Sequence, residues 1–234
     1  MKNNYVIGVL GGMGTYATIH LFQQYAEVFK AEKEWERPRI IIDNRCTMPS
    51  RVRAFLYNEN VEQLIEEMTE SMQGLLKSGC NRIILACNTS HLFLPQIYNK
   101  VPELEKSVVN IINTCVDKIS SEEITKVFLL GSEGTIDSNI YQMALKEKGI
   151  DCIVPQKSEY SLLRDCIEAV KQNNYSNEIE RKFSDLVNRY DTCILGCTEL
   201  PILYEKYRNR IKCKRIYDPL LICIEELKKE YDHE

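Results

Sequence analysis

The chain repeats its own pattern, and this repetition constrains the fold more than any single motif does. Residues 82–91 (RIILACNTSH) form a short apolar run that ends in a small residue, a cysteine and residues with hydroxyl or amide groups. Residues 191–200 (DTCILGCTEL) follow the same plan. Each segment is typical of a buried strand whose end can cap a helix or hold a ligand. The two equivalent cysteines are Cys87 and Cys197.

A second pair of segments repeats in the same order. Residues 6–15 (VIGVLGGMGT) resemble residues 126–135 (KVFLLGSEGT), so a strand, a Gly-x-x-Gly-Thr turn and the start of a helix occur twice. Self-similarity over this length indicates duplicated structural units, although chance similarity among buried strands is the alternative. We therefore predict an α/β fold of two pseudo-symmetric, duplicated parallel-sheet domains, with the active site in the cleft between them.

The length of 234 residues suits two such domains. The first is predicted to cover residues 1–114 and the second residues 115–214. Residues 215–234 contain the closing helix and are expected to pack back on the first domain. No low-complexity linker separates the halves, so they are expected to pack face to face.

Apolar periodicity and turn residues predict the individual elements. Strands are expected at residues 5–10, 39–44, 82–86, 108–112, 126–130, 151–154, 192–196 and 214–217. Helices are expected at residues 17–33, 61–78, 92–100 with a break near Pro95, 114–120, 136–148, 159–172, 177–189 and 220–231. Residues 45–53 are expected to form a loop.

Composition excludes several classes of partner. The formal net charge is −4 and the basic residues are scattered, which disfavours a nucleic-acid surface. No run approaches the roughly 20 apolar residues of a membrane span, and residues 5–12 are too short and glycine-rich for a signal peptide. These features predict a cytoplasmic protein with no membrane or nucleic-acid partner. Its ten cysteines are expected to be reduced thiols, most of them buried.

Cys87 and Cys197 are the main chemical candidates. A thiolate and a thiol that face each other across a cleft can act as base and acid on opposite faces of one carbon, and so invert a stereocentre. The reference pKa of a thiol lies near 8.5, so helix N-terminal amides or nearby cations must hold one cysteine as the thiolate. The other cysteine must keep its proton.

Two other kinds of site, a metal site and a dinucleotide site, are suggested by the spacing of cysteine, histidine and glycine residues. Cys87 and His91 are four residues apart, as are Cys193 and Cys197, but zinc sites usually use tighter Cys-x-x-Cys pairs. We predict no metal, and His91 is more simply a helix cap or a residue that supports Cys87.

The turn Gly8-x-x-Gly11-x-x-Gly14 with Asp43 imitates a dinucleotide site, but it lacks the Gly-x-Gly spacing and the acid comes too late. Backbone amides that meet the carboxylate of a small ligand are the preferred interpretation of this turn.

Four ordered motifs resemble the aspartate/glutamate racemase superfamily. They are residues 11–14 (GGMG), 87–91 (CNTSH), 133–135 (EGT) and 196–200 (GCTEL), and they span nearly the whole chain. The second cysteine motif resembles the aspartate racemase branch, because wall-synthesis glutamate racemases usually have Gly-Cys-Thr-His there. The resemblance implies a cofactor-independent racemase, with no PLP, that acts on aspartate, glutamate or both and commonly forms a homodimer.

The same resemblance implies the roles of individual residues. Cys87 and Cys197 exchange the α-proton, and Asn88, Thr89 and Thr198 hold the α-carboxylate. Arg51 matches a carboxylate-binding arginine, although this chain has Pro-Ser-Arg where the family usually has Pro-Asp-Arg. The complete set of predicted substrate-binding residues is Met13, Arg51, Asn88, Thr89, Thr135, Lys171, Thr198 and Glu199.

From the residues alone, Arg51 and Arg53 are equally able to pair with a carboxylate or to be solvated surface side chains. Glu199 accepts a hydrogen bond from a substrate ammonium or caps the next helix. Two other functions stay open. One is a related lyase or isomerase that uses a single cysteine on a small carboxylic acid, and the other is a non-catalytic amino-acid-binding protein.

Overall fold

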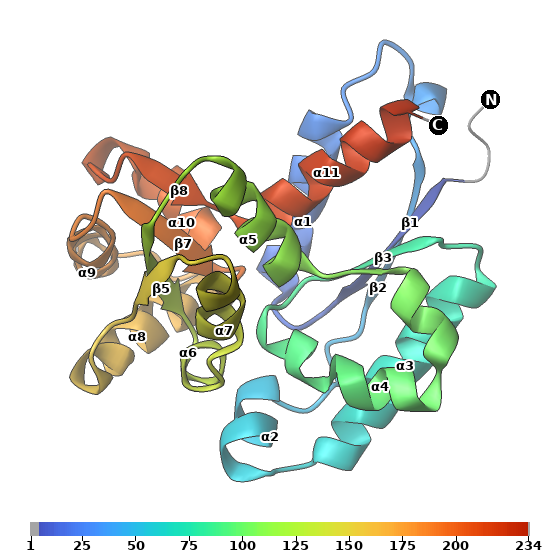
Figure 1. Ribbon diagram of the computed structural model, residues 1–234, viewed down its shortest axis with the longest axis horizontal. Coiled ribbons are helices and arrows are strands. Elements are labelled where there is room, and N and C mark those ends of the chain that lie inside the picture. Colours follow the sequence, from blue (N-terminus) through green and yellow to red (C-terminus); the bar gives the residue numbers. More distant parts are fainter. Residues whose placement is uncertain (1–4, 234) are drawn as a thin grey trace. The chain divides into compact units, whose positions relative to one another are not determined.

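The computed structural model describes residues 5–233, and these form two compact α/β units (Figure 1). The first unit comprises residues 5–111 and 220–233, and the second comprises Ile112–Pro219. Each unit contains one sheet of four parallel strands, in the order β2-β1-β3-β4 in the first and β6-β5-β7-β8 in the second. The predicted duplication of a parallel-sheet α/β unit is confirmed.

The first unit begins with a strand that is buried along its whole length. Its strands are β1 (Val6–Gly11), β2 (Arg39–Asn44), β3 (Arg82–Leu85) and β4 (Val108–Val109). Its helices are α1 (Thr15–Val28), α2 (Arg51–Tyr57), α3 (Val61–Lys77), α4 (Leu94–Lys100) and α11 (Pro219–His233). Short 3-10 turns lie at Glu34–Glu36, Thr89–Phe93 and Pro102–Lys106.

Helices cover both faces of the first sheet, which is why its central strand β1 is continuously apolar (Figure 1). Leu64, Met68 and Met72 of α3 are fully buried, and they belong to one hydrophobic cluster with Leu10 of β1. On the other face, the ring of Tyr231 in α11 contacts the rings of Tyr5 and of Phe29 just beyond α1. The last helix of the chain therefore belongs to the core of the first unit.

The second unit repeats this plan. Its strands are β5 (Lys126–Gly131), β6 (Asp151–Ile153), β7 (Thr192–Gly196) and β8 (Arg215–Tyr217). Its helices are α5 (Ile111–Ser121), α6 (Glu133–Asp137), α7 (Ile140–Glu147), α8 (Tyr160–Lys171), α9 (Asn177–Val187) and α10 (Leu200–Tyr207). Short 3-10 turns lie at Lys157–Glu159 and Arg208–Arg210. Helices α8, α9 and α10 pack against one another.

Three predicted helices differ from the observed ones. The first was predicted to run to residue 33 but ends at Val28, because Phe29 leaves the helical conformation and turns into the core. The helix predicted at residues 136–148 is two helices, separated where Asn139 adopts the left-handed conformation with φ of 59°. Pro95 lies in the first turn of α4, where proline is tolerated, so it does not break that helix.

Segments predicted as strand or loop also differ. Residues 45–53 were predicted as a loop, yet α2 begins at Arg51 because the side chain of Ser50 accepts a hydrogen bond from the Arg53 amide and caps the helix. The strand predicted at residues 108–112 covers Val108–Val109 alone, since α5 starts at Ile111. Strand β8 pairs with β7, so residues 215–217 lie in the second unit.

Helices that could cross a membrane are absent from residues 5–233, since none combines sufficient length with sufficient apolar character.

Candidate active-site residues in each unit

The strand order places the same two loops side by side in both units. In each sheet the first strand is flanked by the second strand on one side and the third on the other. Because the first and third strands are neighbours, the loops that leave them lie next to each other at the carboxyl edge, where open α/β sheets bind ligands. In the first unit these loops carry the glycine turn and Cys87. In the second unit they carry residues 132–135 and Cys197.

Cys87 follows strand β3 and is partly buried beside the hydrophobic cluster of the first unit. The next residues, Asn88, Thr89 and Ser90, are each buried, with exposed fractions of 2%, 3% and 0%. Polar side chains are seldom buried without hydrogen-bonding partners. The partly accessible thiol is thus followed in the chain by three buried side chains that can donate hydrogen bonds.

Met13 and Arg51 meet at the same edge of the first sheet. The guanidinium of Arg51 donates from Nη2 to the Met13 carbonyl and from Nη1 to the Pro49 carbonyl, both at 2.9 Å. Ser90 Oγ contacts Met13 Sδ at 2.8 Å. These bonds join segments that follow three different strands. Ser90 was missed in the sequence, although its position three residues after Cys87 is a signal for it.

Arg51 differs from its neighbouring arginines in its partners. Arg45 forms ion pairs with Glu67 and Glu70, and Arg53 forms one with Glu59. The Arg51 guanidinium contacts backbone carbonyls instead, and its Nε is buried without a hydrogen-bond partner. A guanidinium oriented by the backbone, and not paired with any carboxylate among residues 5–233, is suited to bind a carboxylate ligand.

The glycine turn serves close packing. A Cβ on Gly12 would lie 2.4 Å from the backbone carbon of Arg45, and Gly12 has φ of +78°, so other residues are excluded there. Backbone amides of this turn were expected to meet a ligand carboxylate, and one of them, the amide of Gly12, donates to Thr18 Oγ1 at 3.2 Å. Within its own unit this amide is therefore satisfied, because Thr18 of α1 packs directly under the turn.

His91 supports the backbone at Cys87. Its Nδ1 lies 3.0 Å from the Cys87 carbonyl, and its Nε2 accepts a hydrogen bond from the Ile111 amide at 3.4 Å. This arrangement requires a neutral ring with the proton on Nδ1. Burial lowers the pKa of His91 to about 4, although hydrogen bonds to the backbone oppose that shift. With both ring nitrogens occupied by the backbone, His91 is a structural residue.

We expect protonation of His91 to destabilise the fold in acid. Its folded pKa is about 4, below the usual 6.5, so the unfolded chain binds more protons between these values. Stability is complete above pH 6.5 and falls as the pH drops towards 4, by about 3 kcal/mol. Urea unfolding at pH 7, 5.5 and 4 measures this loss.

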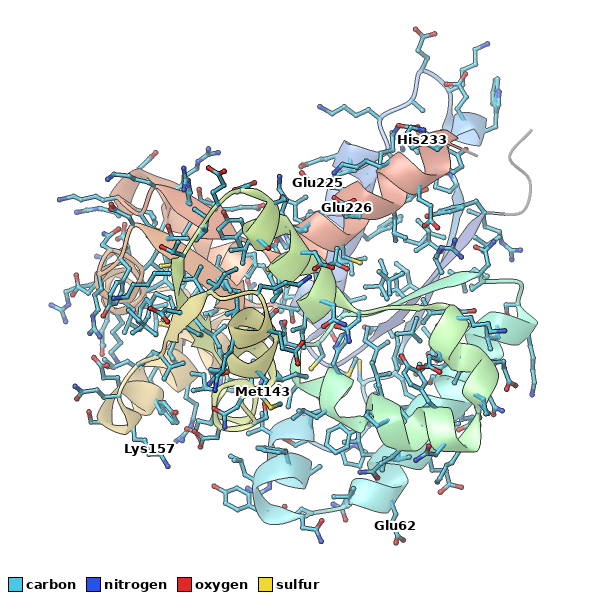
Figure 2. All side chains as sticks on the ribbon, in the orientation of Figure 1. Glu62, Met143, Lys157, Glu225, Glu226 and His233 are labelled. Carbon is cyan, nitrogen blue, oxygen red and sulfur yellow. The ribbon has the colours of Figure 1, made fainter. Side chains whose placement is uncertain are left out.

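His91→Gln should remove that pH dependence. His233→Gln is the matched control, because His233 is exposed at the end of α11 (Figure 2). An equally steep acid loss in His91→Gln would contradict the assignment to His91.

Cys197 occupies in the second unit the place that Cys87 has in the first. It follows strand β7, whose last residue Gly196 pairs with Gly131 at the end of β5. A Cβ on Gly196 would lie 2.7 Å from Leu129 Cδ1 and 3.2 Å from the Leu130 carbonyl oxygen, so the two strands approach closely there and a side chain would displace Leu129. This close approach brings the loop of Cys197 next to the loop that follows β5.

Thr135 lies in helix α6, which begins directly after β5, and is 1% exposed. Ser132 caps helix α6 by accepting a hydrogen bond from the Thr135 amide at 3.3 Å, and the two hydroxyls lie 3.0 Å apart. Ser132 was missed in the sequence, although a serine three residues before a threonine at a helix start is a capping signal. Thr135 is therefore held in place by the cap.

Glu199 is a buried carboxylate next to the thiol of Cys197. Cys197 Sγ donates to Glu199 Oε2 at 3.0 Å, and Thr198 Oγ1 lies 3.4 Å from the same oxygen. Glu199 is 2% exposed, and its Oε1 has no hydrogen-bond partner. The structure thus brings together three residues of the predicted site, and it orients Glu199 towards the thiol.

Lys171 ends helix α8 and binds Glu168 one turn earlier, with 2.8 Å between Nζ and Oε1. Burial opposes its charge, but the hydrogen bond to Glu168 and the charges of Glu199 and Cys197 prevail and raise the pKa of Lys171. Lys171 therefore stays cationic within the electrostatic field of the thiol site. Glu168 was missed in the sequence, although Glu and Lys three residues apart on a helix are a common ion pair.

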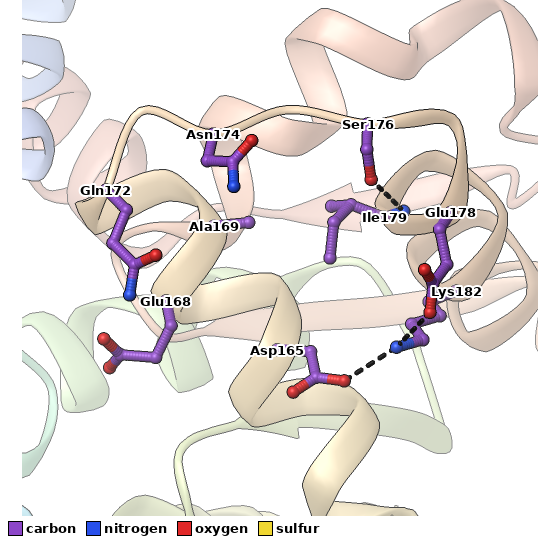
Figure 3. Close-up of a pocket in the computed structure, with 9 residues that line it drawn as sticks. All are labelled: Asp165, Glu168, Ala169, Gln172, Asn174, Ser176, Glu178, Ile179 and Lys182. Atoms are coloured by element: carbon purple, nitrogen blue, oxygen red, sulfur yellow. Dashed lines mark hydrogen bonds and ion pairs between the residues drawn. The ribbon is translucent and has the colours of Figure 1, made fainter.

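A separate pocket of about 300 Å³ lies between helices α8 and α9 (Figure 3). Lys182 crosses it and forms ion pairs with Asp165 and Glu178, at 2.7 Å and 2.8 Å. Glu168 also lines it, but none of the predicted site residues does. The lining contains neither Cys87 nor Cys197, so this pocket is a poor candidate for the predicted thiol chemistry.

Five of the eight remaining cysteines are buried as expected, whereas Cys152 and Cys213 are partly buried and Cys46 is exposed. All ten cysteines are free. Burial raises the pKa of Cys80, Cys115, Cys152 and Cys166, which keeps them protonated. Cys193, considered as a partner of Cys197, is fully buried and directs its Sγ to the Val187 carbonyl at 3.4 Å. Residues 5–233 contain no group of His, Cys, Asp and Glu side chains arranged to hold a metal ion.

The fold and these loops define a duplicated α/β protein with one thiol at the carboxyl edge of each sheet. A family model described as Asp/Glu/Hydantoin racemase matches residues 10–227. The chain belongs to this racemase family and is an enzyme of that class.

Named relatives agree with this membership. The broad specificity amino-acid racemase RacX of Bacillus subtilis is 23% identical over 214 residues, which cover 88% of this chain and 90% of that protein. The glutamate racemase of Aquifex aeolicus is 26% identical over 166 residues, which cover 67% of this chain and 61% of that protein. This chain thus spans about three fifths of that glutamate racemase.

Solved structures show the same fold. The aspartate racemase of Picrophilus torridus superposes with a TM-score of 0.81 at 23% identity, covering 97% of this chain and 94% of that one. An aspartate racemase homologue from Pyrococcus horikoshii gives a TM-score of 0.74 at 24% identity. The superposition covers 99% of this chain and 100% of that chain. At these identities the likeness establishes the arrangement of strands and helices.

Proposed function

We propose that the protein racemises an acidic amino acid, aspartate or glutamate or both, without a cofactor, by proton transfer between Cys87 and Cys197. The observation that carries this proposal is the equivalence of the two thiols. Each follows the third strand of a duplicated sheet, each is partly accessible, and each is followed by buried polar residues.

The proposed reaction needs two groups of opposite protonation state. One cysteine thiolate removes the α-proton and forms a thiol, and the electron pair stays on the α-carbon and its carboxylate. The thiol of the other cysteine then gives its proton to the opposite face of the carbon. The product is the other enantiomer, and the two cysteines have exchanged roles. Hydrogen-bond donors at the carboxylate stabilise the negative charge that develops there.

Two cations support an acidic substrate. In the proposal, Arg51 binds one carboxylate, because no carboxylate in the described part of the chain forms an ion pair with its guanidinium. Lys171 is assigned to the second carboxylate, and its ammonium is already stabilised by Glu168. Asn88, Thr89 and Thr198 are assigned to the α-carboxylate, and Met13 and Thr135 to the walls of the substrate site. The homodimer and the cytoplasmic location stay predictions.

Proton NMR in deuterium oxide tests the proposal directly. The purified, reduced protein is incubated without cofactor with L-aspartate, D-aspartate, L-glutamate and D-glutamate in separate samples. Loss of the α-proton signal together with loss of optical rotation is the expected result for the preferred acid. Release of carbon dioxide would instead indicate a lyase. Binding without exchange from any of the four would leave a binding protein and overturn the racemase proposal.

A further inference from the structure

The two thiols differ in one neighbour, in spite of the duplication. The repeated segments align Cys87-Asn88-Thr89 with Cys197-Thr198-Glu199, so Thr89 stands where the second unit has Glu199. Within the described residues, no carboxylate oxygen accepts a hydrogen bond from Cys87 Sγ, whereas Cys197 Sγ donates to Glu199 Oε2 at 3.0 Å. The pseudo-symmetric pair is therefore chemically asymmetric.

The carboxylate of Glu199 is buried and held by neighbouring groups. It is 2% exposed, and Thr198 Oγ1 lies within hydrogen-bond reach of the same oxygen that accepts from the thiol. Burying a carboxylate is costly unless it has partners. A thiol donor, a hydroxyl and the nearby positive charge of Lys171 supply them. A surface helix cap needs none of this burial, so capping α10 does not explain Glu199.

Charged and titratable groups near this pair come from helices α7 and α8. Lys171 of α8 is cationic and interacts with both Glu199 and Cys197, and Glu168 pairs with that lysine. Tyr141 of α7 is fully buried near Cys197, and burial keeps its phenol protonated by raising its pKa well above the usual value. Since an anion next to a thiol opposes a second negative charge, Cys197 retains its proton.

We propose that Glu199 holds Cys197 in the thiol form in the resting protein, so that Cys197 enters the reaction as the acid and Cys87 as the starting base. This inference rests on the proposed function for its catalytic meaning. When Cys197 gives its proton to the α-carbon, Cys87 carries the proton taken from the substrate, and the roles of the two cysteines are exchanged. The resulting Cys197 thiolate can then accept the α-proton of the other enantiomer, while the Cys87 thiol supplies the proton to the opposite face. The two thiols thus keep one proton between them through each turnover.

Alkylation of the thiols as a function of pH tests this asymmetry without any turnover. Iodoacetamide reacts with the thiolate, and mass spectrometry of the digested protein gives the extent of reaction at Cys87 and Cys197 separately. In Glu199→Gln, the pH midpoint for Cys197 should fall by about one unit or more, because the anion is gone. Its alkylation rate at pH 7 should then rise about tenfold. The midpoint for Cys87 should not move.

Two further variants separate this role from general damage. Glu133→Gln removes another carboxylate of the second unit, which pairs with Arg164, and it should leave both midpoints in place. Glu199→Asp keeps the charge but shortens its arm, so the Cys197 midpoint should lie between wild type and Glu199→Gln. This variant also serves if Glu199→Gln does not fold.

Measuring the Cys197 midpoint and the α-proton exchange separately distinguishes failure of the Glu199 assignment from failure of the racemase function. An unchanged Cys197 midpoint in the Glu199 variants, or an equal shift at both cysteines, overturns the assignment of Glu199. If the midpoint shifts as expected in a protein that shows no α-proton exchange, the racemase function fails and the pairing of Glu199 with Cys197 stands.

Discussion

Replacing either Cys87 or Cys197 by serine is expected to lower the racemisation rate by about 10²- to 10⁴-fold, because a serine hydroxyl is too weak an acid to supply the base at neutral pH. Both variants should lose racemisation in both directions, since each turnover uses one cysteine as base and the other as acid. Polarimetry with both enantiomers of the preferred acid measures the rates.

The pattern of isotope exchange is more specific than the loss of rate. Each single variant keeps one base, so each should still exchange the α-proton of one enantiomer in deuterium oxide, and the enantiomer should differ between the two variants. Cys213→Ser is the control, because Cys213 lies in the loop before β8 and outside both thiol loops. Normal racemisation in either Cys87→Ser or Cys197→Ser would exclude the two-cysteine mechanism.

Replacing Arg51 by methionine is expected to lower kcat/KM by about 10- to 100-fold, the range that corresponds to loss of a charge-assisted hydrogen bond. Arg51→Lys keeps the charge but loses the planar fork, so it should fall between the methionine variant and wild type. Initial rates over a range of substrate concentrations give kcat and KM separately, and most of the effect is expected in KM.

Arg53→Met is the matched control two residues away. Arg53 forms an exposed ion pair with Glu59, and such pairs contribute little. Arg51 also orients the backbone of Met13 and Pro49, so thermal unfolding of each variant must be measured alongside the kinetics. A lower melting temperature in Arg51→Met with an unchanged KM would make Arg51 a structural residue only.

Local pattern was enough to predict the architecture. The apolar runs that became β1, β3, β5 and β7 are read directly from the chain, because a strand covered by helices on both faces must be apolar throughout. Their order and repetition then predicted two parallel sheets. The ends of helices were predicted less well, since they depend on caps such as Ser50 and on left-handed residues such as Asn139.

The hydrogen-bonding partners of the site residues could be identified only from the tertiary structure. The Arg51 guanidinium reaches the carbonyl of Met13, and Ser90 reaches the sulfur of the same residue, across long stretches of sequence. Apart from the family resemblance, the sequence left Arg51 and Arg53 equivalent, and their observed partners distinguish them. Likewise, burial and two backbone contacts, rather than the spacing to Cys87, decide that His91 is a neutral structural residue.

The sequence by itself determined the duplicated α/β plan and the two equivalent cysteines, because strand periodicity and the residues at strand ends are local properties of the chain. The structure decided which charges are neutralised and which are available. Arg51 is held by carbonyls, Lys171 by Glu168, and Glu199 faces the thiol of Cys197. These outcomes follow from packing, since the strength and direction of an electrostatic interaction depend on burial and on distances between atoms.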